Sequence, residues 1–86
     1  MKEEEVLSGL EGVMAHLGVQ VRYEKGDFAG GLCKLKDKPL LIVNSAMPPS
    51  QRIKILAMEL SQMELESVFM VPALRQVIDD VGKEKG

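Results

Sequence analysis

The sequence predicts a single α+β domain over residues 1–86, in which one helix is followed by a three-stranded sheet and two further helices. Three patterns lead to this prediction. Apolar residues recur with the period of a helix over residues 3–17, polar and apolar residues alternate over residues 19–24, and a continuous apolar run occupies residues 40–43. We therefore expect the order α-β-β-β-α-α, with the helices packed on one face of the sheet.

The first helix is expected over residues 3–17. Its apolar stripe consists of Val6, Leu7, Leu10, Val13, Met14 and Leu17. The three glutamates of its first turn suit the positive end of the helix dipole, and Gly18 suits a left-handed residue that ends the helix. Gly9 and Gly12 lie off the stripe and weaken the helix by up to about 1 kcal/mol each relative to Ala. On that side a neighbouring backbone has room to approach closely.

Three strands follow in the predicted fold. The first covers residues 19–24, where Val, Val and Tyr alternate with polar residues. The second covers residues 28–36, with Cys33 and Leu35 on one face. The third is the apolar run at residues 40–43, which we expect in the middle of the sheet because both of its faces are apolar.

Two helices complete the prediction. Proline at positions 48 and 49 suits the start of a helix over residues 49–63. Its main buried stripe consists of Ile53, Leu56, Ala57, Leu60 and Met63. A second, partly apolar side carries Ile55, Met58 and Gln62, with Glu59 beside them. A connector leads to a last helix that opens at Pro72, and a frayed polar tail is expected from about residue 82.

Composition restricts the function classes. The chain of 86 residues has a net charge of −2, so no overall positive field attracts nucleic acid. No apolar run approaches the ~20 residues that span a bilayer, and the acidic start of the chain does not resemble a secretory signal. The single cysteine, Cys33, suits a reducing compartment. We therefore expect a cytoplasmic protein without nucleic-acid or membrane partners.

The second predicted helix carries an incomplete metal motif. A zinc peptidase would have H-E-x-x-H at this place, two imidazoles one turn apart with a glutamate between them. Here the glutamate is Glu59, while Met58 and Gln62 occupy the two histidine positions. Neither residue type is an ordinary zinc ligand in proteins. The sequence therefore predicts no metal site and no cofactor.

Several short segments nevertheless resemble one peptidase family. They are Gly31-Leu32-Cys33-Lys34-Leu35, the strand end Ile42-Val43-Asn44, the helix entry Gln51-Arg52-Ile53, and Phe69-Met70-Val71-Pro72-Ala73-Leu74. Together they resemble the small bacterial gluzincins of the ImmA/IrrE type, which act on transcriptional repressors. The chain is also similar to short bacterial proteins without an assigned activity. The resemblance implies a minimal zincin-like core that has lost its metal-binding histidines, and with them the activated water that Glu59 would deprotonate.

Three residues are candidates for catalytic groups. Glu59 is a weak candidate for a general base, but a lone glutamate on a helix is usually a solvated surface residue. His16, near the end of the first helix, suits the negative end of the helix dipole; the alternatives are catalysis or a metal shared between two copies. Cys33 is expected to be a buried, inert cysteine; the alternative is a reactive thiol.

The lysines of the second and third strands allow two interpretations. Lys34, Lys36 and Lys38 alternate along the chain and could meet an acidic partner. Their simpler role is to protect a strand edge, since charged lysines discourage aggregation between strands.

The leading hypothesis is a non-catalytic binding or assembly module on a metal-free zincin-like scaffold. Its contact face is expected to contain Ile55, Met58, Gln62, Phe69 and Met70. Such an apolar patch usually marks a contact surface, and a homodimer or another protein partner is expected; alternatively, the last helix covers the patch. A second hypothesis is a small hydrolase or thiol enzyme that uses Glu59, His16 or Cys33, and a third is a repressor- or toxin–antitoxin-associated regulator.

Overall fold

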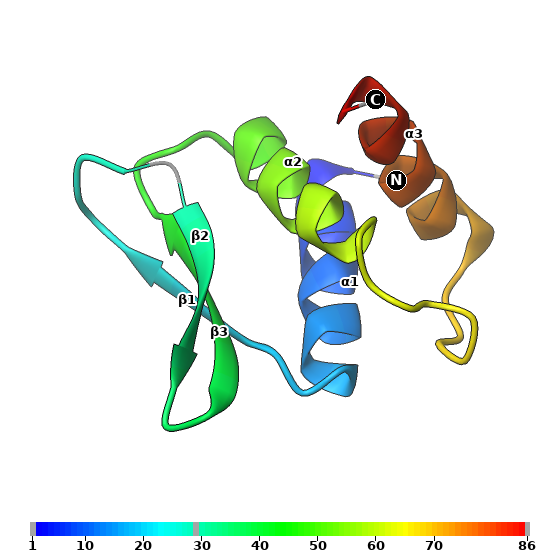
Figure 1. The fold of residues 1–86 in the computed structure, drawn as a ribbon. Coiled ribbons are helices and arrows are strands. Elements are labelled where there is room, and N and C mark those ends of the chain that lie inside the picture. The colour runs from blue at the N-terminus through cyan, green and yellow to red at the C-terminus, as the bar shows by residue number, and fades with distance from the viewer. Residues whose placement is uncertain (1, 29, 86) are drawn as a thin grey trace.

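The computed structural model describes residues 2–28 and 30–85, and its elements follow the predicted order (Figure 1). The elements are α1 (Glu3–His16), β1 (Gln20–Glu24), β2 (Gly30–Leu35), β3 (Lys38–Asn44), α2 (Pro49–Leu60) and α3 (Pro72–Lys85). The α+β class and the order α-β-β-β-α-α are thus confirmed. Ala29 of the predicted second strand and Gly86 of the predicted tail lie outside the described residues.

The sheet has the strand order β1-β3-β2, so β3 lies in its middle. β3 runs parallel to β1 and antiparallel to β2. Leu41 of β3 is opposite Val21 on one side and Leu32 on the other. The central position predicted for the apolar run is confirmed. Such a run suits a strand that is covered on both faces, and Leu40 and Leu41 point to opposite faces and are both buried.

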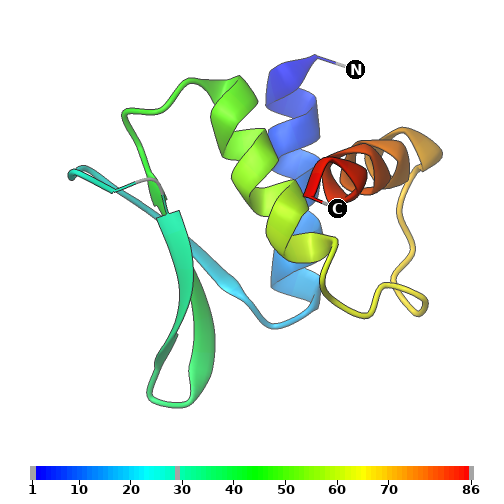
Figure 2. The ribbon, with the colours of Figure 1, turned by 45° about the horizontal axis from the view of Figure 1, so that its top comes forward.

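The helices lie on one side of the sheet and pack mainly against two of its strands, β1 and β3 (Figure 2). α1 packs against α2 and β1, while α2 also contacts β3 and α3. All six residues of β2, by contrast, are exposed. The prediction that the helices cover one face is therefore correct for β1 and β3, but the sheet extends beyond the helices at β2.

The core lies between the three helices and the inner face of β1 and β3. Its most completely buried large side chains are Leu10, Met14, Leu41, Val43, Leu56, Leu60 and Ile78. Helix α3 joins this core across Gly9 of α1, where an added Cβ would lie only 2.6 Å from Cδ1 of Leu74. Gly9 therefore makes room for a neighbouring helix, as its position off the apolar stripe suggests, but a side chain rather than a backbone fills the space.

Helix α1 ends in the way predicted from Gly18. The backbone N–H of Gly18 donates to the carbonyl oxygen of Ala15 at 3.0 Å, and that of Val19 donates to Met14 at 2.9 Å. These two bonds form a Schellman motif, which needs a left-handed residue at the first position after the cap. Gly18 has a φ of 81°, so the prediction is confirmed.

Most boundaries differ from the predictions by one to three residues, and three of the differences have a clear physical reason. The turn between β2 and β3 consists of Lys36 and Asp37, both with positive φ, so Pro39 lies inside β3 and not in the turn. α2 ends at Leu60 and not at residue 63, since the chain turns there toward α3. α3 continues through Lys85, where a frayed tail was expected, because Val81 is buried and Glu84 pairs with Lys54 of α2 at 3.6 Å.

The expectation of a buried cysteine is wrong, because Cys33 is exposed. Alternation along β2 places Cys33 on the face of the sheet that points away from the helices, as its cross-strand partner Leu40 does. Leu40 is shielded by its position in the central strand. Cys33 has no such shield, since β2 lies at the edge of the sheet.

Within residues 2–28 and 30–85, no helix combines the length and the apolar composition that crossing a membrane requires. The longest helices, α1 and α3, have 14 residues each, whereas a spanning helix needs about 20.

Candidate functional site

Strand β2 is the most exposed element of the sheet and has one unpaired edge. Leu32 and Leu35 keep 46% and 48% of their surface exposed, respectively, and Phe28 just before the strand keeps 38%. A two-residue hairpin turn closes on a hydrogen-bonded pair, here Leu35 and Lys38. Alternation then directs the backbone N–H and C=O groups of Leu32 and Lys34 away from β3. The edge therefore offers both hydrogen-bonding groups and apolar side chains.

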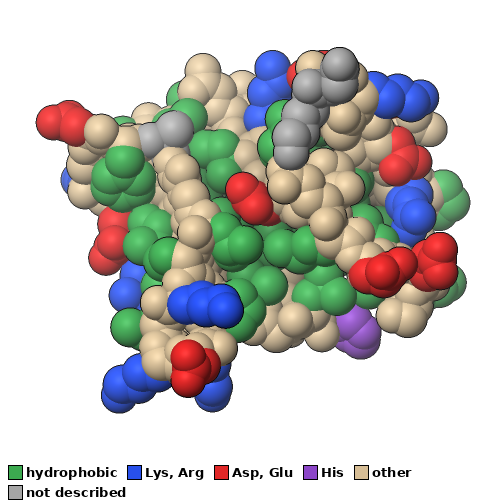
Figure 3. Space-filling view, viewed as in Figure 1, with side chains coloured by type: hydrophobic (Ala, Val, Ile, Leu, Met, Phe, Trp, Pro, Cys, Tyr) green, Lys and Arg blue, Asp and Glu red, His purple; other side chains and the backbone are tan. Residues whose placement is uncertain are grey.

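A groove separates the start of β2 from α2. Its volume is about 240 Å³, and it is lined by Gly30, Lys54, Ile55, Met58 and Glu59. Gly30 is needed here because an added Cβ would lie 2.7 Å from the carbonyl oxygen of Ile42. Hydrophobic side chains fill the hollow between the sheet and α2 in the space-filling view (Figure 3).

A second apolar depression lies against the other side of β2. It has a volume of about 340 Å³ and is lined by Glu24, Phe28, Gly30, Gly31, Leu32, Cys33 and Ile42. Apolar depressions thus flank β2 on both sides. We call the set formed by Phe28, Leu32, Leu35, Ile55 and Met58 the β2 surface.

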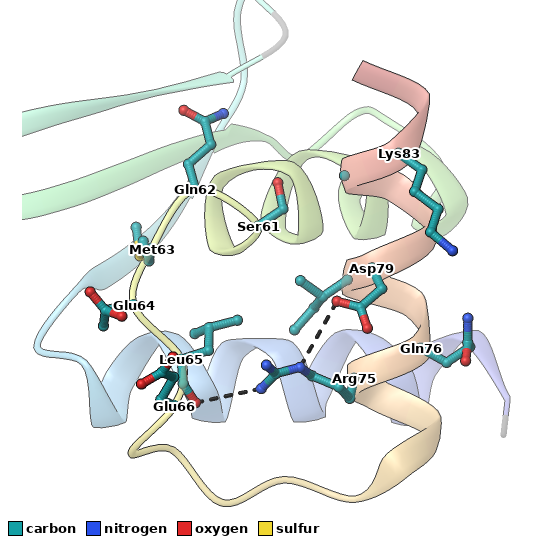
Figure 4. Close-up of a pocket in the computed structure, with 12 residues that line it drawn as sticks. Ser61, Gln62, Met63, Glu64, Leu65, Glu66, Arg75, Gln76, Asp79 and Lys83 are labelled. Carbon is teal, nitrogen blue, oxygen red and sulfur yellow. Dashed lines mark hydrogen bonds and ion pairs between the residues drawn. The ribbon is translucent and has the colours of Figure 1, made fainter. Parts of the chain in front are cut away.

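A third depression lies elsewhere, between α3 and the connector of residues 61–71 (Figure 4). Its volume is about 690 Å³. Arg75 in its wall donates to the carbonyl oxygen of Leu65 at 3.5 Å and pairs with Asp79 at 3.9 Å. Because its rim mixes exposed carboxylates with exposed cations such as Lys83, no single ligand chemistry follows from it.

The predicted contact residues do not form one patch. Ile55 and Met58 lie together in the groove beside β2, but Gln62 lines the large depression near α3. Phe69, which is 95% exposed, and Met70, which packs partly against the core, belong to the connector. The connector lies on the side of α2 away from the sheet (Figures 1 and 2). The last helix does not line the groove, so it leaves Ile55 and Met58 accessible.

The candidate catalytic residues also lie apart. Glu59 lines the groove between β2 and α2, and Cys33 lines the depression on the other side of β2. His16 is exposed at the end of α1 and lines neither. In the part of the chain that the structure describes, no three His, Cys, Asp or Glu side chains are grouped so that they could hold a metal ion.

A polar cluster that the sequence patterns do not reveal joins α1, β1 and α2. The hydroxyl of Tyr23 donates to the carboxylate of Glu11, and the guanidinium of Arg52 lies 5.6 Å from the centre of the Tyr23 ring. Burial, followed by the hydrogen bond and charge of Glu11, raises the pKa of Tyr23 well above 10, and Arg52 opposes this shift only in part. The cluster lines none of the three depressions, so we assign it a structural role.

Asn44 shapes the loops beside the β2 surface. Its Nδ2 donates to the carbonyl oxygens of Gly26 at 2.9 Å and Phe28 at 2.7 Å, and its Oδ1 accepts from the backbone N–H of Ala46 at 2.9 Å. One side chain thus fixes both the segment that leads to β2 and the turn after β3. The only signal for this role in the sequence is an asparagine at the end of an apolar strand.

No family model matches this chain, and neither a curated protein nor a solved structure shows a significant match to it. The zincin-like relationship therefore stays a prediction. The chain's own surfaces are the basis for inferring what it does.

Proposed function

We propose that this protein is a non-catalytic binding or assembly module, and that the β2 surface is where it contacts another protein. The observation that carries the proposal is the exposure of all six residues of β2, including Leu32 and Leu35. Leu32 and Leu35 point to opposite faces of β2, so both sides of this edge strand carry exposed apolar surface, which usually marks a contact surface.

The unpaired edge of β2 favours a partner that supplies an extended segment. Such an edge is a template for pairing with another strand, and proteins usually cover it or protect it with charge. Adding a strand uses backbone hydrogen bonds for affinity, while pockets for alternate side chains give specificity. Here the two depressions beside β2 would receive such side chains.

The side chains at the two metal-ligand positions of α2 support a non-catalytic role. Met58 and Gln62 occupy the positions where a zinc peptidase has histidines, and they line different depressions. The enzymatic alternative needs Glu59, His16 or Cys33 within hydrogen-bond reach of a common substrate. Their separate positions give it no support, and nothing in the structure favours the regulator alternative.

The ancestry and the compartment remain part of the proposal. The order of elements and the position of Glu59 on α2 agree with a degenerate gluzincin core, but shared architecture does not determine function. A lone exposed thiol at Cys33 agrees with a reducing compartment such as the cytoplasm.

The test uses Cys33, the only cysteine of the chain, as the attachment point for a thiol-reactive photo-crosslinker. Illumination in an extract of the source cells should give protein adducts, and Leu32→Glu should abolish them. A matched control carries the same label on α1, through Cys33→Ser with Ala15→Cys, since Ala15 is exposed and far from β2 in the chain. The proposal fails if both labels give the same adducts, or if the Cys33 label gives none.

A further inference from the structure

We propose that the partner of the β2 surface is a second copy of this chain, which inserts its connector, residues 61–71, against β2. This inference rests on the proposed function, since it names the partner of the same surface. The connector and the β2 surface lie on different sides of α2 (Figure 1). Each copy would therefore insert its connector into one neighbour and receive the connector of another neighbour at its β2 surface.

The connector has the features of an inserted ligand. Phe69 at its far end is 95% exposed, and Val71 is 47% exposed. Leu65 and Val68 are buried in the core and hold the base of the connector in place. Because this base is already fixed, little further ordering is needed when Phe69 enters a pocket. Aromatic residues are enriched in the cores of protein interfaces.

The charges of the connector and of the β2–β3 hairpin are opposite in sign. The connector carries Glu64 and Glu66 and contains no lysine or arginine. The β2–β3 hairpin carries the three exposed lysines Lys34, Lys36 and Lys38, with Asp37 as its only acidic residue. Opposite charges across an interface steer association and fix its register.

The backbone of the connector also suits an unpaired strand edge. Residues 68–71 belong to neither helix nor strand. Within the described part of the chain, the N–H groups of Phe69 and Val71 donate to no backbone carbonyl. In an extended segment two such groups, two residues apart, point to the same side, so these donors are available for the outward-facing carbonyl groups of Leu32 and Lys34. The depression of about 340 Å³ beside Leu32 and Phe28 is the pocket that would receive the Phe69 ring.

The alternative pairing of two β2 strands around a twofold axis does not use the connector. It would leave Phe69 uncovered, and it would not bring the acidic connector near the lysines of the hairpin. A contact between two different surfaces does not close on itself in a dimer, so association continues into a ring or an open chain.

Native mass spectrometry and sedimentation over a concentration series test the inference with two variants. Phe69→Ser removes the inserted ring, and Leu32→Glu disrupts the receiving surface. Both positions are exposed, so both variants should fold, and circular dichroism checks this. We expect the wild-type chain to form species beyond the dimer that weaken at 0.5 M salt, and each variant alone to be monomeric. An equimolar mixture of the two variants should form a one-to-one dimer, because each variant retains the surface that the other lacks.

Two results would overturn the inference. A wild-type chain that stays monomeric over the whole series excludes self-association, and a closed dimer that persists in Phe69→Ser indicates twofold pairing. Neither result decides the proposed function, which depends on the crosslinks from Cys33. Adducts with a different protein would retain the β2 surface as a binding site while excluding a second copy as its partner. Ala15→Ser, an exposed change on α1, should behave as the wild type in every measurement.

Discussion

Tyr23 connects burial to a measurable property at the scale of a single residue. It is the only tyrosine in a chain without tryptophan, so absorbance near 295 nm follows its ionisation alone. Because burial and the hydrogen bond to Glu11 raise its pKa, we expect the folded protein to titrate well above 10 and the chain in urea to titrate near 10. A midpoint near 10 in the folded protein would contradict the buried position of the hydroxyl.

The same shift predicts how stability changes at alkaline pH. A raised pKa in the folded state means that the contribution of Tyr23 is fully present below pH 10. That contribution is lost as the pH rises from 10 toward the folded pKa, since the unfolded chain releases the proton first. Urea unfolding of the wild type and of Tyr23→Phe, each at pH 8 and pH 11, measures this contribution to the free energy of unfolding. The wild type should lose more stability between these conditions than the variant, and equal losses would exclude the linkage.

Gly18 and Gly12 are both accessible glycines near the end of α1, but they should respond in opposite ways to alanine. No atom lies within 4 Å of a Cβ added to either residue, so only the backbone conformation distinguishes them. Gly18→Ala places a side chain at a φ of 81° and should cost about 1–2 kcal/mol. Gly12→Ala lies inside the helix and should gain up to about 1 kcal/mol. Urea unfolding measures both, and a neutral Gly18→Ala would show that the left-handed residue is not required.

At the scale of elements, Gly9 controls how α3 packs on α1. Gly9→Ala gains helix propensity, but its Cβ would lie 2.6 Å from Cδ1 of Leu74, and overpacking of this kind costs about 1–3 kcal/mol. We expect Gly9→Ala to be less stable than Gly12→Ala by that amount. In a Leu74→Ala background the penalty should disappear, because the obstructing side chain is gone. A double-mutant cycle from urea unfolding measures the coupling, and additive effects would show that α3 does not depend on this glycine.

The elements themselves were largely predictable, because each carries a local signal. Helical periodicity gives α1, alternation gives β1, and the apolar run gives the central strand β3. The exposure of β2 had no such signal, since Leu32, Cys33 and Leu35 look like residues of a covered strand. Whether a strand is covered depends on how far the helical layer extends, which is set by the packing of α1 and α2 and not by the strand's own residues.

The candidate site was predictable only in part, for the same reason. The second apolar side of α2 indicates Ile55 and Met58, and the structure places both in the groove beside β2. The sequence assigns Phe69 to the same contact face, and the structure leaves it 95% exposed, but its side of the molecule depends on the direction in which the chain leaves α2. Helical periodicity places Met58 and Gln62 near each other, yet the end of the helix at Leu60 assigns them to different depressions.

At the scale of the whole molecule, the core and the exposed sheet edge should differ sharply in their sensitivity to mutation. Leu32 and Leu41 are cross-strand partners, but Leu41 is fully buried whereas Leu32 is 46% exposed. Leu41→Ala should therefore cost about 2–5 kcal/mol. Leu32→Glu should stay within about 0.5 kcal/mol of the wild type, measured on dilute protein to limit association.

Urea unfolding followed by circular dichroism provides this comparison. A large loss of stability in Leu32→Glu would mean that β2 is covered within the single chain, and the β2 surface would then not be available to a partner. A small loss together with the disappearance of crosslinks from Cys33 would separate binding from folding. That combination is expected of a strand whose apolar side chains serve a partner, because the chain already has a complete core without them.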